Sequence, residues 1–210
     1  MEADIESLDL AALLSSRICH DLISPVGAIV NGLEVLEDDN DEETKTFALD
    51  LIKKSARQAS ARLQFCRLAF GASGSAGASI DLGDAEGVAR GFLEDDKTKL
   101  AWNLPRILLP KNRVKLALNM LLTSSNTIPR GGVLTIDPIG EGEQMAFRVG
   151  ANGFNARVPA SLSALLTGEQ DVQSVDAHAI QPFYAGLLAR ACGLALSLEQ
   201  DGPAIVLTAA

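Results

Sequence analysis

Between positions 71 and 77 the sequence reads Gly-Ala-Ser-Gly-Ser-Ala-Gly, and none of these side chains is large enough to pack. Such a segment is typical of a flexible connection. The chain before it has helical patterning, and the chain after it alternates strand-like and helix-like segments. We therefore predict a helical domain at 1–71, a linker at 72–79 and a second domain at 80–210.

Apolar residues recur at three- and four-residue steps in two stretches before the linker, which predicts two long helices. The acidic stretch at 37–43 between them is too polar to bury, so the helices should form an antiparallel hairpin. Asn40 and Glu43 could cap the second helix. The two stripes are Leu14, Ile18, Leu22, Val26, Ile29, Leu33, Leu36 and Ala48, Ile52, Ala56, Ala59, Leu63, Cys66, Phe70.

The hairpin has more apolar surface than its own two helices can cover. Ile23 and Val30 lie beside the first stripe and widen it. A second copy of the chain would bury that surface by forming a four-helix bundle. We therefore predict a homodimer joined through the hairpin.

The second region is predicted to be an α/β layer, in which helices cover one sheet. Apolar runs next to Gly140-Glu141-Gly142 and Asp201-Gly202 predict two hairpins. The expected order is strand, helix, strand, helix, hairpin, helix and hairpin, at 78–82, 84–93, 100–104, 111–123, 133–149, 182–191 and 194–207.

The composition excludes several classes of protein. The chain has 27 acidic and 18 basic residues and a net charge of −9, which argues against binding to nucleic acid. Its most apolar late stretch, 183–198, is interrupted by Arg190, and the acidic N-terminus does not resemble a signal peptide. Three widely spaced cysteines fit neither a disulfide framework nor a metal site. We expect a cytoplasmic protein without a membrane span.

One polar face of the first predicted helix contains a histidine. Arg17, His20, Ser24, Gly27 and Asn31 share this face, opposite the apolar stripe. Its small residues would leave room for a partner to approach. An exposed histidine is also compatible with a merely solvated residue. The second histidine of the chain, His178, has no acidic or cysteine partner at ligand spacing, so we expect a structural role for it.

An exposed imidazole at position 20 suits nucleophilic attack on phosphorus better than metal binding. No second ligand stands at zinc spacing, and the Cys19 side chain points about 100° away on a helix. A phosphoryl acceptor needs an accessible ring nitrogen and a hydrogen bond that fixes the other nitrogen. Asp21 is placed to accept that bond. Pro25 cannot donate to the carbonyl group of Asp21, so the helix should kink there.

The segment 20–29, His-Asp-Leu-Ile-Ser-Pro-Val-Gly-Ala-Ile, resembles the H-box of bacterial histidine kinases. In that motif a histidine is followed by an acidic residue and, further on, by a small polar residue and a proline. Two helices, a linker and an α/β domain also repeat the order of the kinases. The resemblance implies a histidine-kinase ATPase-like α/β sandwich after the hairpin.

The second domain departs from the kinase pattern at the positions that serve ATP. Asn119 matches the first asparagine of the N-box, but Thr123 replaces the second. Residues 149–155 resemble the Asp-x-Gly-x-Gly box, which binds adenine in the kinases. Ala151 stands in place of its aspartate. Gly153 matches its first glycine, whereas Asn155 replaces the second. The segment 179–184 lacks the glycine pair of the nucleotide lid. We therefore expect no bound nucleotide and no cofactor.

A kinase-like chain that cannot hold ATP resembles the ChpT family of alphaproteobacterial histidine phosphotransferases. The resemblance implies a dimer that relays a phosphoryl group from the receiver domain of a hybrid histidine kinase (CckA-like) to cell-cycle response regulators (CtrA-like and CpdR-like). His20 would be the phosphoacceptor, and Asp21 would orient its ring. Mg²⁺ would belong to the receiver, with no metal in this chain. The partner-binding residues would be Arg17, Ser24, Gly27, Ala28 and Asn31.

Two other functions remain open from the sequence. The chain could be a working histidine kinase with an unusual ATP site, or an adaptor that binds a receiver domain and transfers nothing. A kinase would label His20 from ATP without a partner. An adaptor would let phosphate pass between receivers in the presence of a His20→Ala variant.

Overall fold

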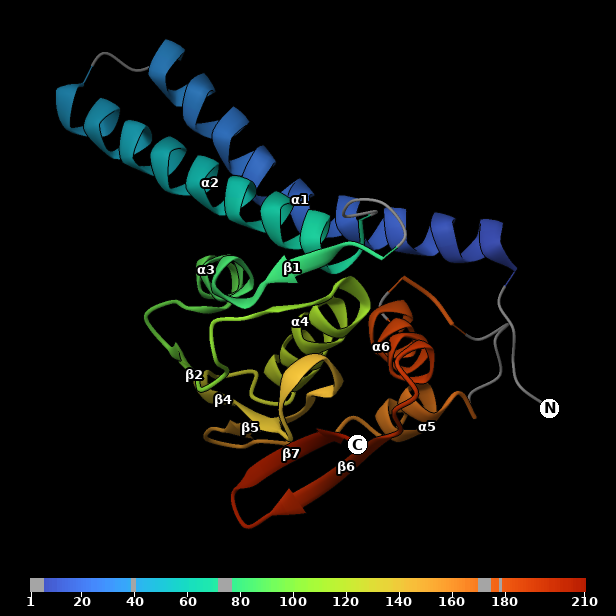
Figure 1. The fold of residues 1–210 in the computed structure, drawn as a ribbon. Helices are drawn as coiled ribbons and strands as arrows, with labels where there is room; N and C mark the ends of the chain where they lie inside the picture. The colour runs from blue at the N-terminus through green and yellow to red at the C-terminus, as the bar shows by residue number, and fades with distance from the viewer. Residues whose placement is uncertain (1–5, 39–40, 72–76, 170–174, 178) are drawn as a thin grey trace.

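The computed structural model describes residues 6–38, 41–71, 77–169, 175–177 and 179–210. Its two long helices, α1 (Ser7–Asp38) and α2 (Glu42–Ala69), form an antiparallel hairpin along one side of the molecule (Figure 1). The prediction of two long helices is confirmed. Asp41 caps α2 by accepting a hydrogen bond from the Thr44 N–H at 2.9 Å. The N-cap is therefore Asp41 rather than Asn40, which lies outside the described residues.

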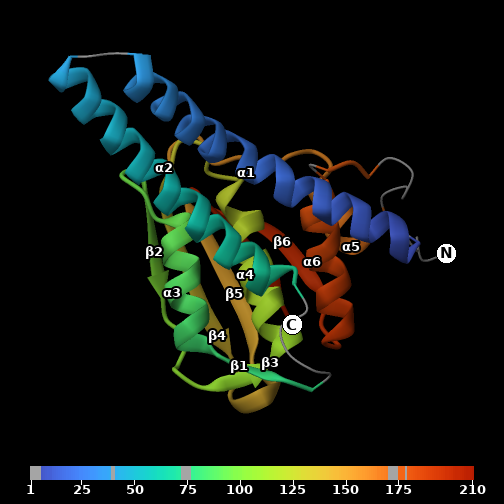
Figure 2. The same cartoon turned by 90° about the horizontal axis from the view of Figure 1, so that it is seen from above.

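Helix α1 bends in its middle, and Pro25 lies within it (Figure 1). A proline inside a helix removes one backbone hydrogen bond and pushes against the preceding turn. The N-terminal half of α1 lies over α6 (Ile180–Ala191), where Leu10, Leu13 and Leu14 pack against a separate apolar cluster. The C-terminal half pairs with α2 and projects beyond the α/β domain (Figures 1 and 2).

The second domain is built on a five-stranded sheet with the order β2-β4-β5-β7-β6. β2 is parallel to β4, and the other neighbours are antiparallel. Two further short strands, β1 and β3, pair with each other beside α3 (Leu82–Leu93) (Figure 2). The strands are β1 (Ser79–Asp81), β2 (Thr98–Trp102), β3 (Leu108–Pro110), β4 (Gly132–Ile139), β5 (Ala146–Asn152), β6 (Leu196–Asp201) and β7 (Ala204–Ala209).

Helices α3, α4 and α6 lie between the sheet and the hairpin, so the predicted α/β layer is confirmed (Figure 1). The central helix α4 is buried along most of its length because it is covered on both sides. Sequence patterning predicted these three helices but missed β3, η1 and α5. The bounds are α3 (Leu82–Leu93), α4 (Lys111–Ser125), η1 (Gly142–Gln144) and α5 (Leu162–Thr167).

The end of α2 belongs to the same hydrophobic core as the α/β domain. Phe65 and Ala69 are fully buried in that core. Phe65 stacks on Phe92 of α3 with ring centroids 4.2 Å apart. The division at 1–71, 72–79 and 80–210 stays a prediction, because residues 72–76 of the linker lie outside the described residues.

Among the described residues, only α1 is long and apolar enough to cross a membrane by length and composition. Its most apolar window has a mean hydropathy of 1.2 and is 6 % buried. The exposed apolar residues of the hairpin include Ile23, Val26, Val30 and Leu33, which are 47–71 % exposed. Exposed apolar residues grouped in this way are typical of an interaction surface.

Candidate functional site

His20 lies near the bend of α1, and its side chain is 62 % exposed. Its Nδ1 atom is 3.6 Å from Oδ1 of Asp21. This arrangement turns one ring nitrogen toward a carboxylate and leaves Nε2 on the opposite edge of the ring. An imidazole whose Nδ1 keeps its proton presents an unprotonated Nε2, which is the nucleophilic form.

Asp21 is held from a second side by Arg17, one helical turn earlier. Nε of Arg17 donates a hydrogen bond to Oδ2 of Asp21 at 3.1 Å. The two side chains are 14 % and 12 % exposed, so the pair is shielded from water. The sequence placed Arg17 on an open polar face. The structure instead turns its side chain into a cavity that residues of the α/β domain also line, among them Asp95, Lys97 and Arg130.

Arg62 of α2 completes the environment of Asp21. Its Nη1 donates a hydrogen bond to the backbone carbonyl oxygen of Asp21. In a regular helix this carbonyl would accept the N–H of residue 25, but Pro25 has no N–H. Sequence reasoning identified the unpaired carbonyl but missed its donor. The proline was a signal that some donor was needed, but the sequence did not show which residue of α2 faces it.

A cavity of about 450 Å³ separates this cluster from the α/β domain. Arg17, Asp21 and Arg62 line it from the hairpin, and Asp95, Lys97 and Arg130 line it from the other side. Its charged lining is mainly basic. Cys66 of α2 is buried near the cluster, where burial, reinforced by the Asp21 carboxylate, raises the pKa of its thiol to about 11.

The other predicted partner-binding residues follow His20 along α1. Ser24 and Asn31 are exposed, and Gly27 and Ala28 are half-buried. A Cβ atom added at Gly27 would meet nothing within 4 Å. These residues leave open space beside His20, and their role in binding stays a prediction.

The N-box asparagine is used for packing. Asn119 is fully buried, and its Nδ2 donates to the carbonyl oxygens of Ala69 at 3.1 Å and Lys115 at 2.9 Å. The hydroxyl of Thr123 donates to the carbonyl oxygen of Asn119 at 2.8 Å. Both side chains therefore form hydrogen bonds inside the protein.

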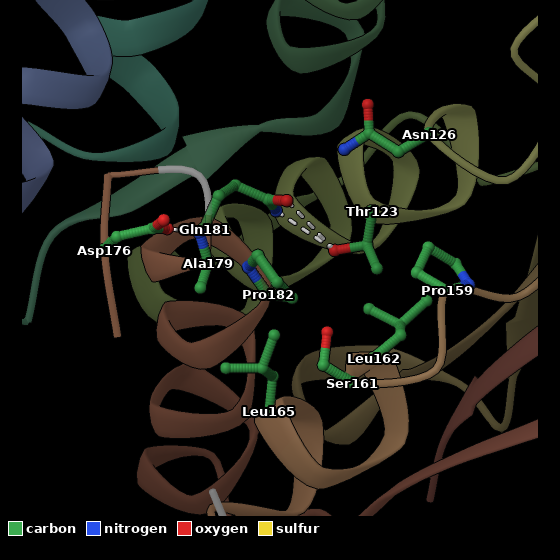
Figure 3. Close-up of a pocket in the computed structure, with 10 residues that line it drawn as sticks. All are labelled: Thr123, Asn126, Pro159, Ser161, Leu162, Leu165, Asp176, Ala179, Gln181 and Pro182. Atoms are coloured by element: carbon green, nitrogen blue, oxygen red, sulfur yellow. Dashed lines mark hydrogen bonds between the residues drawn. The ribbon is translucent and has the colours of Figure 1, made fainter. Parts of the chain in front are cut away.

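The side chain of Gln181, in α6, contacts both Asn119 and Thr123. Its Nε2 donates to the Asn119 carbonyl oxygen at 2.9 Å and to the Thr123 hydroxyl at 3.0 Å. Figure 3 shows this side chain pointing across to Thr123. A cavity of about 380 Å³ lies beside it, and Leu162 and Leu165 form part of its apolar wall.

The adenine-box positions are also packed. Ala151 is fully buried on β5, where it pairs with Leu134 of β4 and Ile205 of β7. A Cβ atom at Gly153 would meet the Gly131 carbonyl oxygen and Ile128. Close packing of the backbone is therefore enough to require glycine at this position, whether or not a nucleotide binds. Asn155 is exposed, with a left-handed φ of 58°. Within the described residues, no group of three or more His, Cys, Asp and Glu could hold a metal ion.

Residues 82–204 match the family described as the histidine phosphotransferase C-terminal domain. The chain is 49 % identical to the protein phosphotransferase ChpT of Brucella abortus (strain 2308), over 98 % of this chain and 97 % of that protein.

The chain belongs to the histidine phosphotransferase family. A solved structure of a bacterial phosphotransferase covers the whole of both chains, with a TM-score of 0.90 and 45 % identity. The histidine kinase domain of a blue-light-activated kinase from Erythrobacter litoralis matches 88 % of this chain and 94 % of its own, at 14 % identity and a TM-score of 0.46.

Proposed function

We propose that His20 accepts a phosphoryl group from the phosphoaspartate of one receiver domain and passes it to the aspartate of another. The observation that carries this proposal is the placement of the ring: its Nδ1 faces the Asp21 carboxylate at 3.6 Å, and the side chain is exposed. The chain is a phosphotransferase by family, and His20 is the histidine of the described residues, because His178 lies outside them.

The transfer needs no proton to leave the ring. The lone pair of Nε2 attacks phosphorus, the N–P bond forms, and the P–O bond to the receiver aspartate breaks. The aspartate leaves as a carboxylate, and the ring becomes a phosphorylated imidazolium that keeps its Nδ1–H. The Asp21 carboxylate faces that N–H and stabilises the positive charge, while Arg17 holds Asp21 in place.

The partner supplies the remaining chemistry. A receiver domain carries its own Mg²⁺ and lysine around an acidic pocket, so this chain requires no metal. Lys97 and Arg130 stand across the basic cavity from Asp21, where they can attract such a pocket. Ser24, Gly27, Ala28 and Asn31 provide the open part of α1 on which it docks. By the family resemblance, the donor is a CckA-like hybrid kinase, and the acceptors are CtrA-like and CpdR-like regulators in the cytoplasm.

The phosphoryl group does not come from ATP in this proposal. The side chains of Asn119 and Thr123 are hydrogen-bonded inside the protein, partly to Gln181, and Ala151 offers no acceptor for an adenine amino group. A nucleotide would have to break these bonds before it could bind. The α/β domain then acts as a structural platform for the hairpin.

A second copy of the chain covers the apolar face of the hairpin in this proposal. The exposed apolar residues of α1 and α2 include Ile23, Val30 and Phe47, all about half exposed or more. Two such hairpins would form a four-helix bundle. Each bundle would then carry two copies of His20.

The test mixes the purified chain with a receiver domain labelled at its phosphoaspartate. We expect alkali-stable, acid-labile label on the wild type and on His178→Ala, and none on His20→Ala. His178→Ala is the matched control because these are the two histidines of the chain. Label on His20→Ala would overturn the proposal.

Two further incubations separate the alternative functions. Labelling of the wild type by ATP and Mg²⁺ alone would show a working kinase. Passage of label between two receivers in the presence of His20→Ala would show an adaptor. We expect neither reaction.

A further inference from the structure

We propose that Arg62 is a positioning residue, which fixes the ring of His20 by supplying the hydrogen bond that Pro25 removes from Asp21. This inference rests on the proposed function of His20 and deepens it. Arg62 belongs to the second helix of the hairpin, 41 residues after Asp21. Its Nη1 reaches the backbone carbonyl oxygen of Asp21 across the helix pair.

The proline makes this contact necessary. The helix bends next to the histidine, and the Asp21 carbonyl lies on the turn that has lost its backbone donor. A half-buried carbonyl without a partner is unfavourable, so the bent turn would shift until water or another group reached it. Arg62 satisfies the carbonyl from α2 and keeps the turn in one orientation.

Asp21 is then held at two separate points. Arg62 binds its backbone oxygen, and Arg17 binds Oδ2 of its side chain at 3.1 Å. The remaining carboxylate oxygen, Oδ1, faces Nδ1 of His20. With both the main chain and one oxygen fixed, the second oxygen can select the ring tautomer that leaves Nε2 unprotonated.

The first measurement is made by nitrogen NMR of the two histidine rings, with the His20 signals assigned by comparison with His178→Ala. In the wild type we expect the Nδ1-protonated form of the neutral His20 ring to predominate. Arg62→Ala should lower its share, and Arg62→Lys should restore part of it. Arg57→Ala removes an exposed cation from the same helix and should leave the ring unchanged. An unchanged ring in Arg62→Ala would overturn the proposal.

This readout needs no receiver domain, so it can succeed or fail independently of the proposed transfer. In the transfer assay, Arg62→Ala should lower the maximal rate by about tenfold or more while the receiver concentration at half-maximal rate stays the same. A change in that concentration alone would show that Arg62 binds the receiver, and it would contradict a positioning role.

A double-mutant cycle with Pro25→Ala tests the physical cause. Alanine at position 25 restores a backbone N–H that can donate to the Asp21 carbonyl. Arg62→Ala should therefore change the ring tautomer and the rate less in the Pro25→Ala background than in the wild type. Equal effects in the two backgrounds would show that Arg62 acts through some other contact.

Discussion

The side chain of Asn119, in α4 of the α/β domain, donates a hydrogen bond to the carbonyl oxygen of Ala69, the last residue of α2, at 3.1 Å. This bond joins the central helix of one domain to the end of the hairpin. Phe65 packs into the same core nearby. The orientation of the hairpin is therefore set by a buried polar contact as well as by apolar packing.

Replacing Asn119 with alanine should destabilise the protein. The change leaves the carbonyl oxygen of Ala69 without this donor and creates a small cavity, so we expect a loss of about 2–4 kcal/mol in the free energy of unfolding. Urea denaturation measures it. Asn126→Ala, at the exposed C-cap of the same helix, is the control and should cost less than about 1 kcal/mol. Equal losses in the two variants would contradict a structural role for the Asn119 amide.

Gly153→Ala should destabilise the protein, although no nucleotide needs the glycine. The added Cβ would meet the Gly131 carbonyl oxygen and lie 2.9 Å from Cγ2 of Ile128, and a backbone oxygen cannot move aside cheaply. We expect a loss of about 1–3 kcal/mol in thermal or urea unfolding. Gly150→Ala, on the strand β5 that ends just before Gly153 and with nothing within 4 Å of its Cβ, should be close to neutral. A neutral Gly153→Ala would argue against this packing role.

The contribution of Cys66 to stability should fall in alkali. Burial, reinforced by the Asp21 carboxylate, raises the pKa of its thiol from 9.0 to about 11, so the folded protein resists ionisation that the unfolded chain allows. The stabilisation is complete below pH 9 and is lost as the pH rises toward 11. The difference in unfolding free energy between the wild type and Cys66→Ala should shrink by about 2 kcal/mol across this interval. A difference that does not vary with pH would contradict it.

Val30→Asp should split the proposed dimer. Val30 is 48 % exposed on the apolar face of α1, and a carboxylate there would be buried without a partner in a four-helix bundle. Sedimentation should give twice the mass of the chain for the wild type and a single copy for the variant. Gln58→Asp, at an exposed polar position of α2, should remain dimeric. A monomeric wild type would contradict the dimer and indicate that another partner binds this apolar face. Binding to lipid vesicles would then identify that partner as a lipid surface.

Much of the fold could be predicted because its signals are local. Two apolar stripes of period 3.6 predicted α1 and α2, and glycine-containing turns predicted the hairpins around 140–142 and 201–202. β3 and α5 were missed because each is very short, and their apolar residues do not form a periodic pattern. Such segments acquire their structure from tertiary contacts rather than from their own sequence.

The site was only partly predictable. The pairing of His20 with Asp21 follows from their adjacency, and the bend follows from Pro25. The burial of Arg17 and the contact from Arg62 depend on how α2 and the α/β domain pack against α1, which no local pattern encodes. The same is true of Gln181, whose bonds to Asn119 and Thr123 span about 60 residues of the chain.

The packing around Ala151 has a consequence for protein engineering. An aspartate introduced at this fully buried position would place a charge in the core, at a cost of several kcal/mol. An asparagine introduced at Thr123 would have to displace the Gln181 amide, which donates to the Thr123 hydroxyl. An ATP site could therefore not be built into this chain one residue at a time without a loss of stability at each step.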